Sequence, residues 1–121
     1  KYNIASYMAK ALGGVSIERE DDRKAMVSII EIIKKIKSGL NFFIFPEGTR
    51  NRTQQLLLPL KKGAVYVSQV SQKPVVPIAI KKYGRKYVVN IGNKIVFETK
   101  ESVREGTVRL KHILEGLLLE I

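Results

Sequence analysis

The feature that most constrains the fold is the alternation of helical and strand-like apolar patterns along the chain. Residues 21–39 combine an apolar stripe at helical spacing with Asp21 and Asp22 at its start and Gly39 after its end, which predicts a helix. The stripe consists of Ala25, Ile29, Ile32, Ile33 and Ile36. The next segment, residues 41–45, is a continuous apolar run of strand length, which predicts a central strand buried on both faces.

The same reasoning predicts further helices and strands on both sides of this pair. We expect helices over residues 2–12, 63–72 and 101–120, and strands over residues 15–19, 75–80, 87–91 and 94–97. Gly92 and Asn93 predict a turn between the last two strands, and Pro77 indicates an edge, a bulge or a strand end. Such alternation is typical of an α/β fold, here a single domain of 121 residues with a mixed, mostly parallel sheet flanked by helices.

Composition narrows the classes of partner and of chemistry. The chain has 22 lysines and arginines against 11 acids, a formal charge of +11, which attracts nucleic acids, anionic lipid headgroups or phosphorylated small molecules. The basic residues form no dense stripe with interleaved aromatic residues, which argues against a nucleic-acid partner. There is no cysteine, which excludes disulfides, Cys-ligated zinc and a thiol nucleophile. No stretch approaches the ~20 apolar residues that span a bilayer.

Residues 46–50, with the sequence PEGTR, follow the predicted central strand directly. Loops at the carboxyl ends of strands are the usual ligand sites of α/β folds. Gly48 permits close approach of a ligand to the backbone, and Arg50 can grip a phosphate with two parallel hydrogen bonds. Glu47 can hold that arginine or bind a ligand hydroxyl. The alternative is a solvated turn with a chance ion pair, but the position after a buried strand favours a site.

Three further positions have weaker signals. Arg19 follows a short apolar run much as Arg50 does, so the two arginines could converge on one anion, or Arg19 could be a surface residue. Lys61 and Lys62 precede a predicted helix start, where free N–H groups attract anions, although a solvated loop has the same composition. His112, the only histidine, lies on the predicted last helix without a metal-ligand or triad pattern around it, so we expect it to face solvent.

The string FPEGTR at residues 45–50 resembles the third signature block of the glycerolipid acyltransferases, the family of 1-acyl-glycerol-3-phosphate acyltransferase. Serine usually follows this block, where the chain has Asn51. Three other stretches resemble family blocks in the same order: GGVSIER at 13–19, LKKGA at 60–64 and VVPIAI at 75–80. The first family block, NHxxxxD, is absent, since Leu117 stands five residues after His112. We therefore expect residues 1–121 to be the C-terminal portion of one acyltransferase domain, with the catalytic His and Asp upstream of Lys1.

The resemblance implies a glycerol-3-phosphate acyltransferase-like fold and the transfer of an acyl group from a thioester, on acyl-CoA or acyl carrier protein, to the free hydroxyl of 1-acyl-glycerol-3-phosphate. It implies neither a bound cofactor nor a metal. It places Arg19, Glu47, Gly48, Thr49 and Arg50 in the acceptor site, with added positive potential from Lys61. Pro46 and Pro77 would shape the pocket.

The resemblance also offers an explanation for the formal charge of +11, because a basic face holds a peripheral enzyme on an anionic membrane. We expect this membrane contact at the cytoplasmic side. The leucines of residues 56–60 could enter that interface or fold back into the core. The alternative function is a non-catalytic module that binds lipid or phosphate on the same scaffold.

Overall fold

The computed structural model describes residue 11 and residues 21–121 of the chain, which divides into two compact units, Lys1–Phe42 and Phe43–Ile121. Of the predicted helix over residues 2–12 only Ala11 is described, and the predicted strand over residues 15–19 lies outside the described residues. No helix in the described part of the chain is both long and apolar enough to cross a bilayer.

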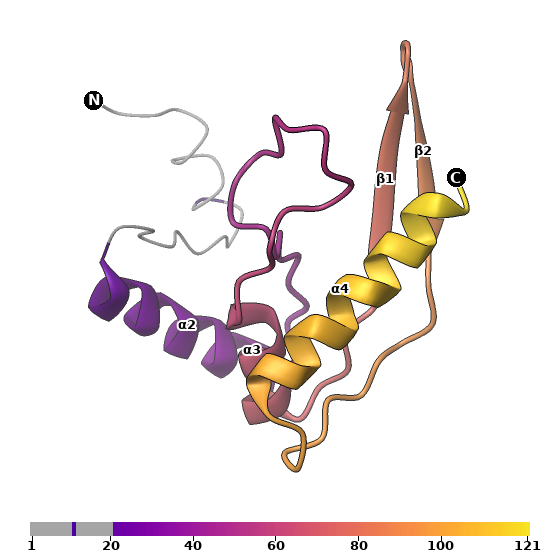
Figure 1. Ribbon diagram of the computed structural model, residues 1–121. Helices are drawn as coiled ribbons and strands as arrows, with labels where there is room; N and C mark the ends of the chain where they lie inside the picture. Colours follow the sequence, from indigo (N-terminus) through magenta and orange to yellow (C-terminus); the bar gives the residue numbers. More distant parts are fainter. Residues whose placement is uncertain (1–10, 12–20) are drawn as a thin grey trace. The chain divides into compact units, whose positions relative to one another are not determined.

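The first unit contains helix α2, Asp22–Lys37 (Figure 1). Its N-cap is Asp21, whose carboxylate accepts hydrogen bonds from the backbone N–H groups of Arg23 and Lys24 at 3.0 and 3.2 Å. These bonds satisfy donors that the first turn leaves without a partner. The predicted helix is confirmed, because Ile32 and Ile33 of the apolar stripe are buried and three lysines lie in the last turn.

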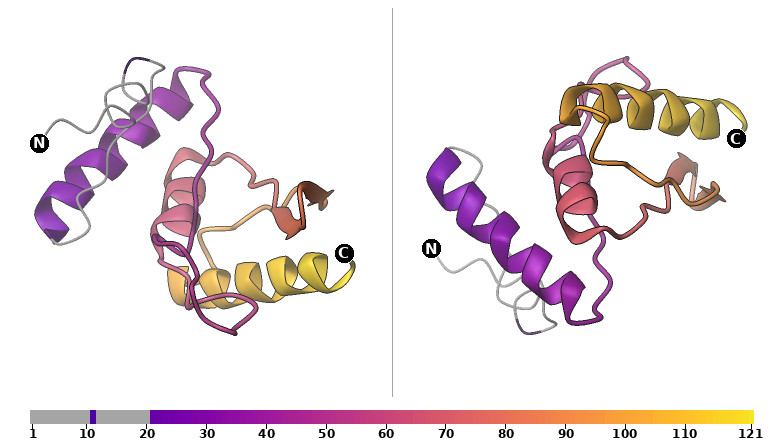
Figure 2. Two further views of the ribbon diagram at one scale, coloured as in Figure 1. Left: turned by 90° about the horizontal axis from the view of Figure 1, so that it is seen from above. Right: turned by 90° about the horizontal axis from the view of Figure 1, so that it is seen from below.

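The second unit contains two helices and two strands: α3 (Gly63–Ser71), β1 (Ile78–Tyr83), β2 (Lys86–Ile91) and α4 (Val103–Leu119). Helix α4 contacts α3 and both strands, and it lies along one face of the hairpin in all views (Figures 1 and 2). The core is formed by residues from α3, α4 and the extended segment before α4: Ala64, Val65, Ile95, Phe97, Leu110 and Leu114. Both predicted helices of this unit are confirmed, with ends shifted by one or two residues.

Among the glycines of the described residues, Gly106 of α4 leaves the least room for a side chain. A Cβ atom at Gly106 would lie 2.7 Å from a methyl carbon of Val65 and 3.1 Å from the ring of Phe97. Val65 is fully buried, so it has no room to move away. The absence of a side chain at Gly106 is therefore what lets α4 pack against α3.

Strands β1 and β2 form an antiparallel hairpin, in which Tyr83 pairs with Lys86. Gly84 has φ of +57°, whereas Arg85 does not have a positive φ, the arrangement of a two-residue type II′ turn with glycine first. The predicted hairpin around Gly92 and Asn93 is wrong, because β2 pairs backward with β1. Residues 94–97 form no strand; Ile95 and Phe97 are buried, and Ile95 makes a single antiparallel bridge with Val75.

The predicted central strand over residues 41–45 is not formed. Phe43 and Phe45 are 86% and 81% exposed, so the predicted burial on both faces is also wrong in this structure. The physical reason is that a strand needs neighbours for its backbone hydrogen bonds. The only sheet among residue 11 and residues 21–121 is the antiparallel hairpin, so the mostly parallel sheet is not confirmed.

Candidate functional site

Residues 46–61, which we call the PEGTR loop, form a closed surface loop that leads into α3. The backbone N–H of Lys61 donates to the carbonyl of Pro46 at 2.7 Å, so the two ends of the loop meet. The N–H of Gly48 donates to the carbonyl of Phe45 at 3.1 Å, which makes a tight turn over Pro46 and Glu47. A loop of this length with joined ends has the form of an Ω-loop, a frequent carrier of functional residues.

Glu47 ties the turn to the far side of the loop. The backbone N–H of Leu58 donates to Oε2 of Glu47 at 2.9 Å, across eleven residues of chain. A hydrogen bond to an ionised carboxylate is stronger than one to a neutral acceptor. The structure shows a carboxylate that holds the loop closed, with Oε1 not engaged by this bond; that Glu47 holds an arginine or binds a ligand hydroxyl stays a prediction.

Gly48 and Lys61 lie against each other at the joined ends of the loop. Gly48 has φ of +69°, a conformation that residues with a side chain rarely adopt. A Cβ atom there would lie 3.2 Å from Cγ of Lys61, so the aliphatic stem of Lys61 covers the glycine. The structure thus brings Lys61 next to the PEGTR sequence, and its contribution to an acceptor site stays a prediction.

Asn51 organises the outer part of the loop, a role that the sequence analysis did not assign. Its Nδ2 donates to the carbonyl of Gln55 at 2.7 Å, and its Oδ1 accepts from the N–H and the hydroxyl of Thr53 at 2.9 and 2.7 Å. The spacing Asn-x-Thr was the available signal, because asparagine side chains bond to the backbone two residues ahead in Asx-turns.

The cations of the loop face water without an acid beside them. Thr49, Arg50 and Lys61 are exposed, and no ion pair of Arg50 or Lys61 is formed within the described residues. The sequence has no acid at all between Glu47 and Glu98. The loop carries Arg50, Arg52 and Lys61 against the single carboxylate of Glu47, so it has a net positive charge that attracts an anion.

The leucines of the loop divide between core and surface. Leu57 and Leu60 pack against the core cluster, whereas Leu56 is 41% exposed. Of the two alternatives for these leucines, folding back into the core is therefore confirmed for Leu57 and Leu60.

The comparisons with known proteins decide the family. The acyltransferase family model matches residues 1–81, more than half of the chain. The chain belongs to the acyltransferase family. The match includes the PEGTR loop, α3 and the start of β1.

Named relatives and one solved structure agree with this assignment. The chain is 28% identical to the 1-acyl-sn-glycerol-3-phosphate acyltransferase of Escherichia coli over 122 residues, which cover 90% of this chain and 49% of that protein. It is 37% identical to human 1-acyl-sn-glycerol-3-phosphate acyltransferase beta over 78 residues, 63% of this chain and 28% of that one. The crystal structure of the 1-acyl-sn-glycerophosphate acyltransferase PlsC from Thermotoga maritima shares the fold, with a TM-score of 0.78 at 23% identity, over 99% of this chain and 52% of that chain. The chain thus spans about half the length, or less, of these relatives.

Three further residues singled out in the sequence are Arg19, Pro77 and His112, and none of them belongs to the loop itself. Arg19 lies outside the described residues, so its predicted convergence with Arg50 stays a prediction. Pro77 is buried directly before β1, where its carbonyl accepts a hydrogen bond from Gly92 at 2.9 Å, so the predicted strand end is confirmed. His112 is exposed on α4, as expected, with Nδ1 4.0 Å from a carboxylate oxygen of Glu115. Within residues 21–121 and residue 11 no cluster of three or more potential metal ligands occurs.

The shortest ion pair of the described residues supports α4, not the loop. Arg109 binds Glu101 through two parallel hydrogen bonds of 2.9 and 2.8 Å and stacks on Phe97 with 4.7 Å between the guanidinium carbon and the ring centre. The hydrogen bond from Arg109 lowers the pKa of Glu101 below its ordinary value, and Glu101 raises the pKa of Arg109. This pair fixes the segment that enters α4.

Proposed function

We propose that the chain is part of an enzyme that transfers an acyl group from a thioester, on acyl-CoA or acyl carrier protein, to the free hydroxyl of 1-acyl-glycerol-3-phosphate, which yields phosphatidic acid. The observation that carries the proposal is the closed PEGTR loop, in which Arg50 and Lys61 are exposed and form no ion pair within the described residues. Family membership and relatives named 1-acyl-sn-glycerol-3-phosphate acyltransferase support it.

The acceptor's phosphate is the group that the loop is suited to bind. We assign the phosphate to Arg50, assisted by Arg19, because a guanidinium can donate two parallel hydrogen bonds to phosphate oxygens. Lys61, whose stem lies over Gly48, adds positive charge at the joined ends of the loop. Thr49 offers a hydroxyl beside Arg50. Glu47 acts through the backbone of Leu58 and positions the loop, and Pro46 sets its turn.

The chemistry needs a general base, which the family resemblance assigns to the histidine of an NHxxxxD block that this sequence lacks. The base removes the proton of the acceptor hydroxyl, the oxygen attacks the thioester carbonyl, and the thiolate of the donor leaves, without a covalent enzyme intermediate. His112 is the only histidine, and it is 76% exposed on α4 outside the PEGTR loop. We therefore propose that an NHxxxxD block in residues upstream of Lys1 supplies the base, so that residues 1–121 are the C-terminal portion of the domain. No bound cofactor is part of this mechanism.

The exposed aromatic residues before the loop support a larger sheet in the complete domain. Phe43 and Phe45 are almost fully exposed, although they belong to a run of strand composition. The solved acyltransferase that shares this fold is about twice as long as the matched region. We propose that residues 41–45 join a mostly parallel sheet when the remaining half of the domain is present.

The competing function is a non-catalytic module that binds lipid or phosphate on the same scaffold. Both functions use Arg50, and both place the protein on the surface of an anionic membrane. We propose that this surface is the cytoplasmic face of the membrane. They differ in the base, so acyl transfer distinguishes them.

The test measures phosphatidic acid formed from lysophosphatidic acid with acyl-CoA and with acyl carrier protein as donors. The 121-residue chain is compared with a chain that carries its native upstream residues. We expect activity in the longer chain alone. Activity in the 121-residue chain would show that the assignment of the base is wrong, and inactivity of both with intact lipid binding would favour the non-catalytic module.

A further inference from the structure

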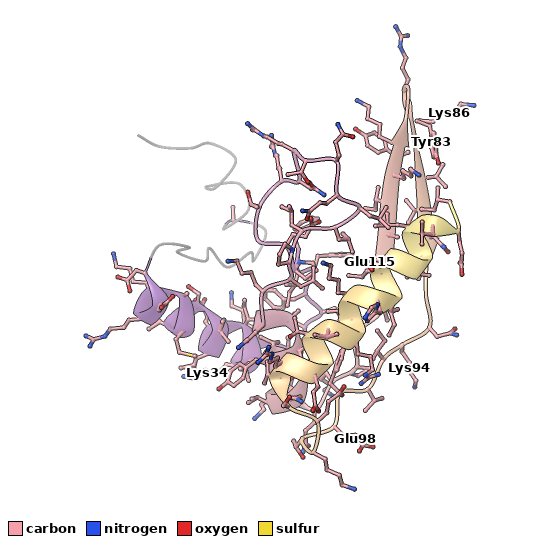
Figure 3. The ribbon with its side chains drawn as sticks, in the orientation of Figure 1. Lys34, Tyr83, Lys86, Lys94, Glu98 and Glu115 are labelled. Atoms are coloured by element: carbon pink, nitrogen blue, oxygen red, sulfur yellow. The ribbon has the colours of Figure 1, made fainter. Side chains whose placement is uncertain are left out.

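A cluster of positive charge lies at the end of the hairpin. Ten lysines and arginines and no acid lie between Glu47 and Glu98. Four of the ten fall within six residues that include the turn: Lys81, Lys82, Arg85 and Lys86. We call residues 81–87, KKYGRKY, the hairpin tip. It projects beyond the end of α4, and Tyr83 and Lys86 lie at the opposite end of the second unit from Lys94 and Glu98 (Figure 3).

No acid in the described chain pairs with these four cations. Instead, the Nζ atom of Lys81 lies 5.3 Å from the ring centre of Tyr83, and the Nζ atom of Lys82 lies 5.9 Å from the ring centre of Tyr87. Such contacts hold the ammonium groups beside the aromatic rings and leave their charge available to an external anion. The tip therefore combines unneutralised cations with two tyrosines in one short turn, so the expectation that the chain has no dense run of basic residues with interleaved aromatic residues is wrong here.

The hairpin is anchored on one face and open on the other. On the anchored face, the Tyr83 hydroxyl donates to the carbonyl of Ile121 at 3.0 Å, and the Asn90 amide donates to the carbonyl of Leu117 at 3.0 Å. Residues on the other face alternate with these and are more than half exposed: Ile80 at 54%, Tyr87 at 66% and Val89 at 53%. Helix α4 thus holds the hairpin in place, and the open face of the hairpin presents apolar side chains directly behind the cations of the tip.

We propose that the hairpin tip is a contact site for an anionic phospholipid bilayer. Tyrosine rings settle at the level of lipid headgroups, and lysine and arginine side chains reach the phosphates while their stems cover apolar surface. The apolar residues behind the tip can contact the boundary between lipid headgroups and acyl chains, whereas a polynucleotide offers no matching apolar surface. The inference rests on the proposed function in one respect: an enzyme whose acceptor is a membrane lipid needs a surface that meets the membrane.

The first test places a fluorescent reporter at the tip. The chain has no tryptophan, so Tyr87→Trp creates a single tryptophan at the tip. Val96→Trp is the control, at a residue that is also exposed, at 61%, but lies two residues after Lys94 and outside the tip. Each variant is mixed with vesicles of phosphatidylcholine, with or without phosphatidylglycerol, which is neither the proposed acceptor nor the proposed product. We expect a blue shift and quenching by brominated lipid for Tyr87→Trp alone, and with the anionic vesicles alone.

The second test removes the charge and measures vesicle affinity by co-sedimentation. The tip variant changes four cations to glutamine: Lys81, Lys82, Arg85 and Lys86. The control variant makes the same change of net charge at four exposed lysines elsewhere: Lys24, Lys73, Lys94 and Lys100. Because each cation near an anionic surface strengthens binding by roughly fivefold, we expect the tip variant to lose about 100-fold or more of its affinity and the control variant far less.

Three results would overturn the proposal: no response of the tip reporter, equal responses of both reporters, or equal losses in both charge variants. Tip-dependent binding of an oligonucleotide that exceeds binding to anionic vesicles would overturn it as well. Failure of the proposed function is seen separately, because lysophosphatidic acid binding that depends on Arg50 is measured without vesicles. If the tryptophan at the tip gives no response to vesicles while lysophosphatidic acid binding still depends on Arg50, the membrane site is refuted and the proposed function is not.

Discussion

Replacing Glu47 by alanine should open the PEGTR loop without unfolding the second unit. The variant removes the carboxylate that accepts the Leu58 N–H at 2.9 Å and leaves the bond between Lys61 and Pro46 in place. A hydrogen bond to a charged group contributes about 1.5–3 kcal/mol. This free energy corresponds to an increase of about 10- to 150-fold in the population of the open loop.

Amide hydrogen exchange of Leu58 measures that opening directly. We expect its exchange rate to rise by the factor above in Glu47→Ala and by a smaller factor in Glu47→Gln, which keeps a neutral acceptor. Glu98→Ala, with the same change of charge in the same unit, is the control and should leave Leu58 unaffected. Unchanged exchange at Leu58 in Glu47→Ala would refute the reasoning that Glu47 positions the loop.

Two further predictions concern helix α4. Gly106→Ala should lower the free energy of unfolding by about 1–3 kcal/mol, because its Cβ would collide with buried Val65. Gly116→Ala, whose Cβ would have no atom within 4 Å, should raise the free energy of unfolding by about 0.5–1 kcal/mol through helix propensity. Equal effects of the two variants in chemical denaturation would contradict the packing at Gly106. The pKa of Glu101 is lowered by Arg109, so the stabilisation by this pair is complete above the ordinary pKa of 4.5 and is lost as the pH falls through the lowered value. Glu101→Gln should therefore be less stable than the parent chain at pH 7 and equally stable in strong acid, and a constant difference across that range would refute the linkage.

The elements that the sequence predicts correctly are those with local signals. Helix α2 has an apolar stripe and an acidic N-cap, and these signals act within a few residues. The sheet was predicted less well, because pairing depends on contacts between distant residues. The Gly92–Asn93 turn is compatible with a hairpin, yet β2 pairs with β1 around Gly84 and Arg85, where glycine comes first in the turn.

The strand predicted over residues 41–45 shows a second limit. Its composition indicates burial, but Phe43 and Phe45 are exposed because burial requires neighbours that the described residues do not supply.

The position of the candidate site could be predicted from the sequence, but the contacts within it could not. The position of PEGTR after an apolar run indicated the loop, and Lys61 was expected near it. The contact of Glu47 with Leu58 spans eleven residues and has no local signature, so its positioning role emerged only from the structure.

The central claim is that Arg50 of the closed PEGTR loop binds the phosphate of the acceptor. Its most direct test compares binding of lysophosphatidic acid with binding of the corresponding monoacylglycerol, which lacks the phosphate, in Arg50→Ala and in Arg52→Ala. We predict that Arg50→Ala weakens binding of lysophosphatidic acid by about 10- to 150-fold and leaves monoacylglycerol unaffected, while Arg52→Ala changes neither strongly. Equal losses for both ligands, or equal losses in both variants, would contradict the account.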